Sequence, residues 1–389
     1  MRALIIGGGI GGLAAAVALQ RVGIEAVVFE KAPEITEVGA GLSLWSNAIL
    51  AARRLGIEAE IVAAGSVVSK TRSLLPSAEP IDEFDLAALS RKADAPTVCA
   101  HRADLQRILL EAALACDPTA VWTGCECVAC EQEGGGVSAV FADGSRERGD
   151  VLIGADGLHS AVRRSLFGDQ TLRYAGYYAW RGIAHGVGGL LPEGQVQLVI
   201  GRGAQAGCFH CGGDRIYWFL THNSPPHSHA GPSGNRAEIV ALVEDWRLPM
   251  RRFAEATDED TILRNDIIDA PPRRIWGKGR ATLLGDAAHA TTPNLGQGAC
   301  QALEDAVILA HSLRSIASAE TGLRDYEARR RERANFVIDQ SRQLGKALQL
   351  SNPVGVWLRN VVSRTKWAQR HSEKLLARLL MVDLPELKA

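Results

Sequence analysis

The first residues that point to chemistry are three glycines near the amino terminus. Gly7, Gly9 and Gly12 have the spacing G-x-G-x-x-G, directly after the apolar run 3–6 and at the start of a helix-like stretch. This order of strand, tight turn and helix lets backbone N–H groups approach a pyrophosphate at the positive end of the helix. Glu30 ends the next apolar run, 18 residues after Gly12, and suits a carboxylate that accepts hydrogen bonds from ribose hydroxyls. The pattern predicts a bound dinucleotide with an unmodified 2′-hydroxyl.

A signal peptide is the alternative interpretation of the same segment, because Arg2 precedes an apolar, alanine-rich stretch. Five glycines interrupt that stretch, and a strand pattern follows it at once, which argues against export. We therefore expect Met1 to be a mature cytosolic start and the protein to be cytoplasmic.

The composition agrees with a soluble enzyme. The chain has 389 residues, of which 47% are hydrophobic and 22% charged, and its formal net charge is −1. A chain of this length buries a substantial core in two or three units, and this charge balance implies no nucleic-acid partner. No apolar run approaches the roughly 20 residues that span a bilayer, so we expect no stable membrane insertion.

The eight cysteines are irregularly placed, which favours a reducing compartment over a disulfide framework. Cysteines cluster at 125–130 and again as a C-x-x-C pair at 208–211, which raises the question of a metal site. The first cluster lies in an alternating, strand-like stretch that sends Cys127 and Cys130 to opposite faces. Zinc-binding C-x-x-C pairs normally lie in tight turns. We expect buried thiols and no metal.

A second chemical segment lies far downstream, at 285–299. The strand pattern 281–284 delivers Gly285-Asp286, and a helix pattern runs from Gly298 to about residue 312. Backbone N–H groups of 295–299 at this helix start suit the negative charge that a reduced flavin carries at its pyrimidine edge. Glycines at 296 and 298 allow close approach, and Pro293 fixes the turn beside the ring. A helix-capping role for Asp286 and a plain pre-helix role for Pro293 remain the alternatives.

Elsewhere the chain first alternates strands and helices and then changes character. We expect a loop at 39–43 with a helix from Asn47 to Leu55, an irregular excursion at 71–98, which contains three prolines, and a helix at 102–115. Hairpin signals fill 121–149, and a helix pattern spans 160–166. Short aromatic and apolar runs at 171–275 predict a mainly β inserted domain. The expected division is a FAD-binding domain (1–70, 99–170 and 276–340), a substrate domain (71–98 and 171–275) and a C-terminal helical segment (341–389).

Taken together, the motifs resemble the class A flavin-dependent aromatic monooxygenases. This group includes para-hydroxybenzoate, salicylate and 3-hydroxybenzoate hydroxylases, urate hydroxylases and zeaxanthin epoxidases. Three family signatures occur in order over roughly the first 315 residues: the glycine turn with Glu30, Asp156-Gly157 within 154–163, and Gly285-Asp286. The segments 39–43 and 101–105 match as well. The resemblance implies an α/β fold, with a Rossmann-like FAD-binding domain of the glutathione-reductase type.

The resemblance also implies which residues bind the cofactor. Asp286 is placed against the ribityl chain of FAD, and Arg102 against the cofactor. Asp156 bridges the pyrophosphate region and transient NAD(P)H binding, although an Asp that caps the helix after residue 160 explains the same motif structurally. The implied cofactor-binding set is Gly7, Gly9, Gly11, Gly12, Glu30, Lys31, Ser43, Arg102, Val128, Asp156, Asp286, Pro293, Leu295, Gly296, Gln297, Gly298 and Ala299.

The implied reaction has two halves. NAD(P)H reduces FAD, and O2 then adds to give a flavin C4a-hydroperoxide whose distal oxygen passes to an electron-rich aromatic substrate, from a site that must exclude water. No second G-x-G-x-x-G follows a predicted strand, which argues against disulfide reductases and Baeyer–Villiger enzymes with two dinucleotide sites. The absence of W-x-W argues against a flavin-dependent halogenase. An epoxidase of an isoprenoid or polyketide-type substrate and a non-catalytic flavin-binding protein remain alternatives.

Substrate choice is expected in the inserted domain. The residues that we predict to face the flavin are Tyr177, Trp180, Arg181, Gln205, His210, Tyr217 and Trp218, with His210 as the base that deprotonates a phenol. The predicted catalytic set is Pro293, His210, Arg181 and Tyr217. Relative to urate hydroxylases, an Asn and an Arg are replaced by Ala179 and Gln205. A polar heterocycle loses its partners there, so we favour a less polar aromatic, phenolic or fused-ring substrate.

Two charged groups are interpreted as solvated surface. Arg163 and Arg164 are predicted to lie at an exposed helix end rather than to bind a nicotinamide phosphate, and Arg329–Arg331 with Arg333 on a solvated helix face. The tail after Leu344 carries tryptophans among basic residues. It fits an amphipathic cover or an oligomer contact, and the expected state is a monomer or a homodimer.

Overall fold

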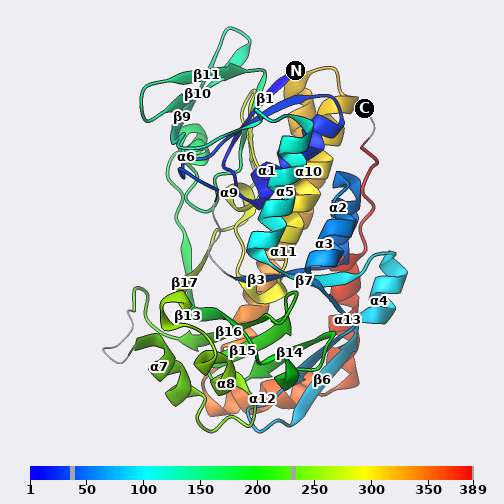
Figure 1. The fold of residues 1–389 in the computed structure, drawn as a ribbon, viewed down its shortest axis with the longest axis vertical. Helices are drawn as coiled ribbons and strands as arrows, with labels where there is room; N and C mark the ends of the chain where they lie inside the picture. Colours follow the sequence, from blue (N-terminus) through cyan, green and yellow to red (C-terminus); the bar gives the residue numbers. More distant parts are fainter. Residues whose placement is uncertain (36–39, 229–233, 388–389) are drawn as a thin grey trace.

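The computed structural model describes residues 1–35, 40–228 and 234–387. A five-stranded parallel sheet lies in the upper half of the molecule as drawn in Figure 1. Its strands are short, and the apolar residues of all but the edge strand that contains Trp122 are buried, as the runs in the sequence predicted. Their order across the sheet is β18 (Ala281–Leu283), β12 (Val151–Gly154), β1 (Arg2–Ile6), β2 (Glu25–Phe29) and β8 (Val121–Trp122).

Helices from distant parts of the chain pack beside this sheet, with α1 between α5 and α10 (Figure 1). The residues of α1 are almost all buried, so it is apolar on every side, as a helix enclosed by neighbours must be. The helices of this half are α1 (Ile10–Arg21), α2 (Ser46–Leu55), α3 (Glu58–Ala64), α5 (Arg102–Cys116), α6 (Ala161–Phe167) and α10 (Gly298–Ser315). The predicted hairpins form an antiparallel sheet of β9 (Cys127–Glu133), β10 (Gly136–Phe141) and β11 (Arg146–Gly149).

A seven-stranded sheet dominates the lower half of Figure 1, with α7 (Gly234–Leu242) and α8 (Met250–Glu255) beside it. Two of its strands come from 71–98, so the prediction of an irregular segment there is wrong. Its prolines misled the interpretation, because Pro80 starts the edge strand, where a missing N–H costs nothing. The strand order is β17 (Leu263–Asp269), β13 (Arg173–Ala184), β16 (Ile216–Asn223), β15 (Ala204–His210), β14 (Gln195–Ile200), β5 (Lys70–Leu74) and β6 (Pro80–Asp85).

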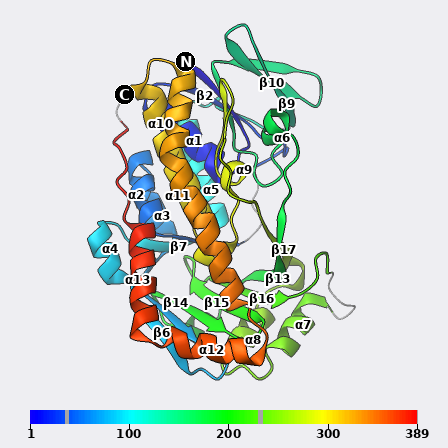
Figure 2. The ribbon, with the colours of Figure 1, turned by 180° about the vertical axis from the view of Figure 1, so that it is seen from behind.

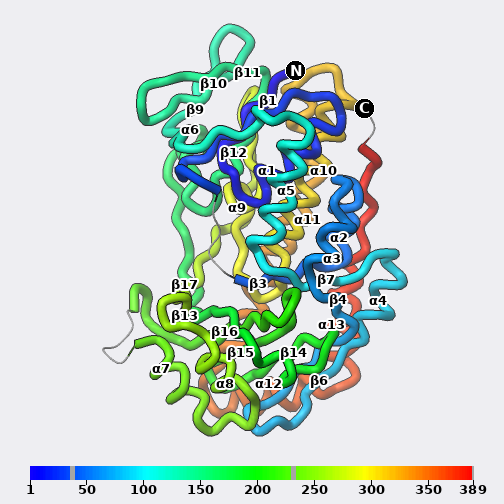
Figure 3. Tube along the Cα trace, in the orientation of Figure 1, coloured from blue at the N-terminus to red at the C-terminus, as the bar shows by residue number. Residues whose placement is uncertain are grey.

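A small antiparallel sheet lies at the junction of the two halves in Figure 3. It consists of β3 (Gly41–Leu44), β7 (Thr97–His101) and β4 (Ser66–Val68), and α4 (Leu86–Ala93) lies next to it. The predicted loop at 39–43 is therefore a strand from Gly41 onward, while Gly39 lies outside the described residues. A Cβ on Gly41 would lie 2.4 Å from Tyr217, so glycine permits the close contact between this sheet and the seven-stranded one.

The carboxyl-terminal third joins both halves. Helix α11 runs down the length of the molecule, and the chain then turns back upward through α13 until both termini lie at the same end (Figure 2). Leu384 and Leu387 end in the same core as the parallel sheet. Among the described residues no helix combines the length and the apolar character that crossing a bilayer requires. The elements are α9 (Asp286–His289), α11 (Ala319–Leu348), α12 (Pro353–Ser363), α13 (Lys366–Leu380), and the 3-10 turns η1 (Gly188–Leu190), η2 (Glu259–Thr261) and η3 (Pro293–Leu295).

Candidate active site

The glycine turn leaves an open space in front of α1. Gly7 has φ +109°, and a Cβ there would lie 2.5 Å from the carbonyl oxygen of Ala155. A Cβ on Gly12 would lie 1.9 Å from the Gly7 oxygen, so both glycines are required by the protein itself. A Cβ on Gly9 meets no atom within 4 Å. That open position lies at the helix start, where a pyrophosphate gains both backbone donors and the helix dipole.

Glu30 braces the same turn. One carboxylate oxygen accepts from the Gly8 N–H at 2.6 Å and the other from the Ala32 N–H at 2.9 Å, while Gln106 donates to the Gly8 carbonyl at 3.1 Å. The carboxylate is partly exposed and each oxygen has a further lone pair, so it still suits ribose hydroxyls.

Three other predicted cofactor residues are exposed. Lys31 follows Glu30, Val128 lies on β9, and Arg102 begins α5 with its N–H on the Ala40 carbonyl at 2.8 Å. The structure thus groups Lys31 with the glycine turn and places Arg102 beside the strand that carries Ser43.

One carboxylate oxygen of Asp156 bonds the start of α6, and the other has no partner among the described residues. Its Oδ2 accepts from the N–H groups of Ala161 at 2.7 Å and Val162 at 3.1 Å, which is the capping role considered as an alternative. Its Oδ1 is buried and has no hydrogen-bond partner among the described residues. A buried acceptor without a partner is costly, so a donor from a bound group fits this position.

Arg163 is buried, not solvated as the sequence predicted, and only 5% of it is exposed. It donates to the Ala287 carbonyl at 3.0 Å and to the Leu158 carbonyl at 2.6 Å. This side chain therefore ties the Asp156 motif to the Asp286 motif. Arg164 is exposed, as predicted.

Asp286 is available to a ligand. It is the first residue of α9, follows Gly285 with φ +61°, and its exposed carboxylate forms no hydrogen bond within the described part of the chain. The helix-capping interpretation is not supported, because no side chain caps this helix. The Gly285 N–H donates instead to Asp305 at 3.0 Å.

The predicted flavin-edge segment has an open backbone. Pro293 is exposed at the start of η3, Gly296 has φ +62°, and a Cβ on Gly298 would meet no atom within 4 Å. Nε1 of Trp45 is buried, has no hydrogen-bond partner within residues 1–35, 40–228 and 234–387, and lies 3.0 Å from where a Cβ on Gly296 would be. The open glycines and this unused donor fit a flat polar ring between β3 and α10.

The remaining side chains of this segment point into the protein. Gln297 is buried and shares hydrogen bonds with Asn47 and Gln301, so its backbone is the part left to face a cofactor. Leu295 packs against Val337 in a small core. The Ser43 hydroxyl lies 3.4 Å from the Cys99 sulfur, and Ala299 is partly exposed in the first turn of α10.

The seven-stranded sheet meets this segment through Tyr177, whose hydroxyl donates to the Asn294 side chain at 2.8 Å. Residues in register across the sheet share a face, and this face carries Tyr177, Arg181, Gln205 and Tyr217. The guanidinium of Arg181 forms no hydrogen bond or ion pair, and the Tyr217 hydroxyl forms no hydrogen bond, with any described residue.

The other face carries Trp180, Trp218 and His210. Trp180 donates to Asn235, Trp218 donates to Thr257, and the His210 ring bonds the Leu191 carbonyl at 2.9 Å. The prediction that these three residues face the flavin is not supported, because strand alternation turns them away from Tyr217. The geometry likewise gives no support to His210 as the base.

Burial determines the direction of the pKa shifts of Tyr177 and Tyr217, the two tyrosines predicted for the site that lie on this face. It raises the pKa of Tyr177 to about 12 and raises the pKa of Tyr217, while the positive charge of Arg181 lowers both pKa values. Desolvation is the larger effect on each phenol, so both are neutral at physiological pH.

A buried cluster of charged side chains on α10 and α11 bonds the turn before Asp286. The sequence analysis did not predict this cluster. Arg330 is 2% exposed, which corrects the prediction of a solvated face, and it binds Asp305 at 2.7 Å and Glu304 at 2.5 Å. Arg333 also reaches Glu304, whereas Arg329 and Arg331 are exposed as predicted. Asp305 in turn bonds His289. The only sequence signal was a pair of acids inside the apolar run 302–309.

The cysteines behave in two ways. Cys127, Cys208 and Cys211 are buried as expected, but Cys125 and Cys130 are partly exposed. The described residues contain no group of three or more side chains arranged to hold a metal ion.

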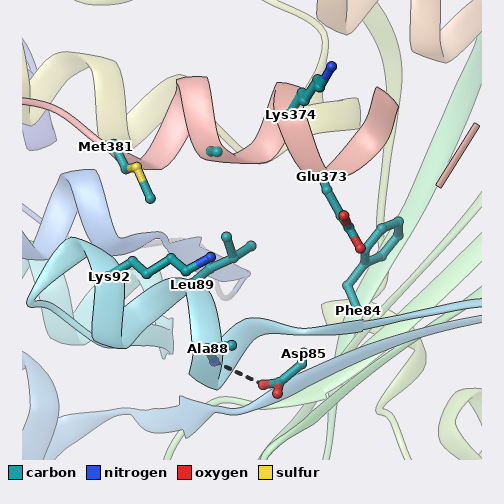
Figure 4. Close-up of a pocket in the computed structure, with 9 residues that line it drawn as sticks. Phe84, Asp85, Ala88, Leu89, Lys92, Glu373, Lys374 and Met381 are labelled. Carbon is teal, nitrogen blue, oxygen red and sulfur yellow. Dashed lines mark hydrogen bonds between the residues drawn. The ribbon is translucent and has the colours of Figure 1, made fainter. Parts of the chain in front are cut away.

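A cavity of about 370 Å³ lies elsewhere, between α4 and α13. Phe84, Leu89 and Met381 contribute to its lining, and Figure 4 shows Asp85 of its rim bonded to the Ala88 N–H. None of the predicted site residues lines it.

The parallel sheet, the open glycine turn and the Asp156 and Asp286 oxygens that no described residue bonds are together typical of a dinucleotide-binding protein. Comparison with known proteins narrows this class. The FAD binding domain family matches residues 1–178 and 270–341.

Relatives that match over about nine tenths of this chain are also FAD-dependent enzymes or monooxygenases by name. The aurachin C monooxygenase/isomerase of Stigmatella aurantiaca is 39% identical over 367 residues, covering 94% of either chain. The FAD-dependent urate hydroxylase of Klebsiella pneumoniae is 35% identical over 358 residues, covering 90% of this chain and 92% of the relative. The structure of Klebsiella pneumoniae HpxO with FAD and uric acid matches with a TM-score of 0.91 at 32% identity, over 98% of this chain and 97% of that one. The chain belongs to the class A FAD-dependent monooxygenases.

Proposed function

We propose that this protein uses NAD(P)H and O2 to hydroxylate an aromatic or phenolic small molecule at a bound FAD. The observation that carries the proposal is the Tyr177–Asn294 hydrogen bond, which fixes the face bearing Arg181 and Tyr217 against the flavin-edge segment. When bound and reduced, FAD supplies the electrons that activate O2 for transfer of one oxygen atom. The protein supplies binding, orientation and the exclusion of water.

The cofactor contacts follow from the open positions. The adenosine and pyrophosphate end is held by the glycine turn, Glu30 and the free oxygen of Asp156. The ribityl chain is held by Asp286, and the ring lies against the 295–299 backbone and Trp45. The first contacts act on phosphate and sugar, and the last act on the ring whose charge changes on reduction.

NAD(P)H is proposed to bind only transiently, at the flavin. The sequence has a single G-x-G-x-x-G after a strand, and a permanently held second dinucleotide needs its own turn.

Arg181 and Tyr217 are proposed to bind the substrate. A guanidinium without a carboxylate partner suits a phenolate or another electron-rich oxygen, and a neutral tyrosine hydroxyl suits an acceptor beside it. Holding the phenolate raises the electron density of the ring that receives oxygen.

A substrate less polar than urate is proposed. Ala179 and Gln205 share the substrate face, and Ala179 has no polar side-chain atom to meet a heterocycle. Relatives are named both for urate and for aurachin C, so the family context permits either chemistry. Epoxidation of an isoprenoid or polyketide-type compound is the second candidate, since zeaxanthin epoxidases match at 34% identity.

The domain division is also a proposal. Residues 1–70, 99–170 and 276–340 form the FAD-binding domain, 71–98 and 171–275 the substrate domain, and 341–389 a helical segment. The seven-stranded sheet supports it, because its strands come from β5, β6 and β13 to β17.

The test is flavin absorbance at 450 nm after NADH or NADPH is added to the purified holoprotein, across a panel of phenols, fused aromatics, isoprenoids and urate. We expect one aromatic class to accelerate bleaching and to yield a product that contains one atom of labelled O2. Bleaching coupled to urate alone contradicts the substrate assignment. FAD that is never bleached by either nicotinamide supports a non-catalytic flavin-binding protein.

A further inference from the structure

Helix α12 exposes its apolar side chains, whereas a surface helix normally buries them. Its apolar residues point to solvent, with Val354 74% and Trp357 64% exposed, and Leu358, Val361 and Val362 continue the same face. Spacings of three, four and seven residues place these side chains on one side of a helix. Figure 2 shows α12 at the lower end of the molecule, below the seven-stranded sheet.

The polar residues of α12 face the protein. Arg359 donates to the carbonyls of Leu348 at 3.0 Å and Gly201 at 2.9 Å, and the Asn352 side chain caps the helix start. Arg202, which follows β14, also donates to the Ser351 carbonyl just before α12, at 2.5 Å. These bonds hold the helix to the seven-stranded sheet with its apolar side outward, so the exposed face is a fixed feature of the fold.

Positive charge lies beside this face, on α13. Arg359, Arg364 and Arg378 already have partners within the protein. Between residues 351 and 380 the chain has six Arg or Lys and one Glu, although the whole chain has a formal net charge of −1. Lys366, Arg370 and Lys374 are exposed on α13, and Figure 4 shows Lys374 pointing away from α4. Trp367 adds a 71% exposed ring that stacks on His371.

We propose that α12 and the start of α13 dock the protein on an anionic lipid surface. Trp, Leu and Val suit the boundary between headgroups and acyl chains, and the neighbouring Lys and Arg suit acidic headgroups. The helix lies in the plane of the surface and does not cross it. We call residues 354, 357, 358, 361, 362 and 367 the apolar patch.

A second copy of the chain is the main competitor for this surface, and its charges disfavour it. A twofold dimer brings the same patch of each copy together, so the basic residues that flank the apolar patch would face one another. Like charges in an interface cost free energy, whereas acidic headgroups neutralise them. The charge complementarity therefore favours lipid.

The test is flotation of the holoprotein with vesicles of phosphatidylcholine alone and with added phosphatidylglycerol, at low and high salt. We expect binding only to the anionic vesicles, weakened by salt. Each of Lys366→Gln, Arg370→Gln and Lys374→Gln is expected to lower the partition coefficient about fivefold. The variant Trp357→Ser with Leu358→Ser should lose binding, while Ile275→Ser, another exposed apolar residue outside the patch, should not.

FAD content and light scattering complete the experiment. Variants that retain FAD and lose flotation support the proposal. If the serine variant does not fold, quenching of wild-type tryptophan fluorescence by brominated lipid gives the same information. Equal binding to both vesicle types, no binding to either, or a stable dimer that dissociates in the serine variant overturns it. None of these readouts depends on the substrate or on turnover.

Discussion

Arg330 on α11 donates from Nε to Oδ1 of Asp305 on α10 over 2.7 Å, with both side chains almost entirely enclosed by protein. The other oxygen of Asp305 accepts from the Gly285 N–H at 3.0 Å. A single carboxylate thus connects the long helix to the turn that presents Asp286. The geometry at Asp286, the predicted ribityl contact, therefore depends on a buried charge pair on two other helices.

The first prediction concerns this pair. Arg330→Met leaves buried carboxylates with fewer partners and is expected to lower the free energy of unfolding by about 3–5 kcal/mol. Arg329→Met removes a neighbouring exposed pair with Asp325 and is expected to cost less than about 1 kcal/mol. Urea denaturation of both variants measures the difference. Similar losses for the two variants would contradict a stabilising role for the buried pair.

The second prediction is a pH dependence. Burial opposes the ionisation of Asp305, but the nearby His289 and Arg330 outweigh it and lower the pKa of Asp305 to about 2. The pKa of Glu304 is also lowered, because Arg330 and Arg333 outweigh the effect of its burial. A depressed folded-state pKa stabilises the protein above the unfolded value of about 4, and this stability is lost as pH falls toward 2. Wild type and Asp305→Asn should therefore differ most above pH 4 and converge in acid, as followed by circular dichroism. A difference that grows as pH falls contradicts this assignment.

The sequence predicted those features of the fold that are determined by residues close together in the chain. The glycine turn, the hairpins and the helix after Gly298 depend on steric and turn preferences within a few residues. Arg330 was misread because its partners lie 25 and 26 positions away on another helix. An arginine-rich run does not reveal which of its members meets a buried acid.

His210 illustrates a second limit. Alternation along a strand was evident, but which residues share the face of Tyr177, whose hydroxyl bonds Asn294, depends on the register between strands. That register pairs Phe209, not His210, with Tyr217. Side-chain direction in a sheet therefore requires the long-range pairing that a single sequence does not display.

The third prediction separates two glycines of one turn. Gly9→Ala adds a Cβ that has no atom of the described residues within 4 Å, so stability should be unchanged while FAD affinity falls. Gly12→Ala places its Cβ 1.9 Å from the Gly7 oxygen, so the turn itself should fail. Thermal unfolding of the apoproteins and FAD titration distinguish the two effects. Normal FAD affinity in Gly9→Ala would mean that the pyrophosphate lies elsewhere.

The fourth prediction concerns Asp286. Its carboxylate has no partner among the described residues, so Asp286→Ala should leave apoprotein stability unchanged. A lost hydrogen bond to a charged group costs about 1.5–3 kcal/mol, which weakens FAD binding roughly ten- to a hundredfold. Asp260→Ala, another exposed carboxylate, is the control and should bind FAD normally. Fluorescence titration measures both, and equal affinities would remove Asp286 from the cofactor site.

The fifth prediction tests the substrate face. Arg181→Met should raise KM for a phenolic substrate at least about tenfold, with Arg181→Lys in between, because the lysine keeps the charge but loses the planar pair of donors. The increase should be larger above the pKa of the substrate's phenol, where the bound form carries the charge that Arg181 meets. Tyr217→Phe, which deletes a neutral donor, should show no such pH dependence, since burial raises the pKa of Tyr217. Arg251→Met, an exposed arginine paired with Glu255, is the control for a lost surface charge. If Arg181→Met changes kcat and KM no more than this control does at any pH, the substrate oxygen does not bind at Arg181, and the face opposite the flavin-edge segment needs another anchor.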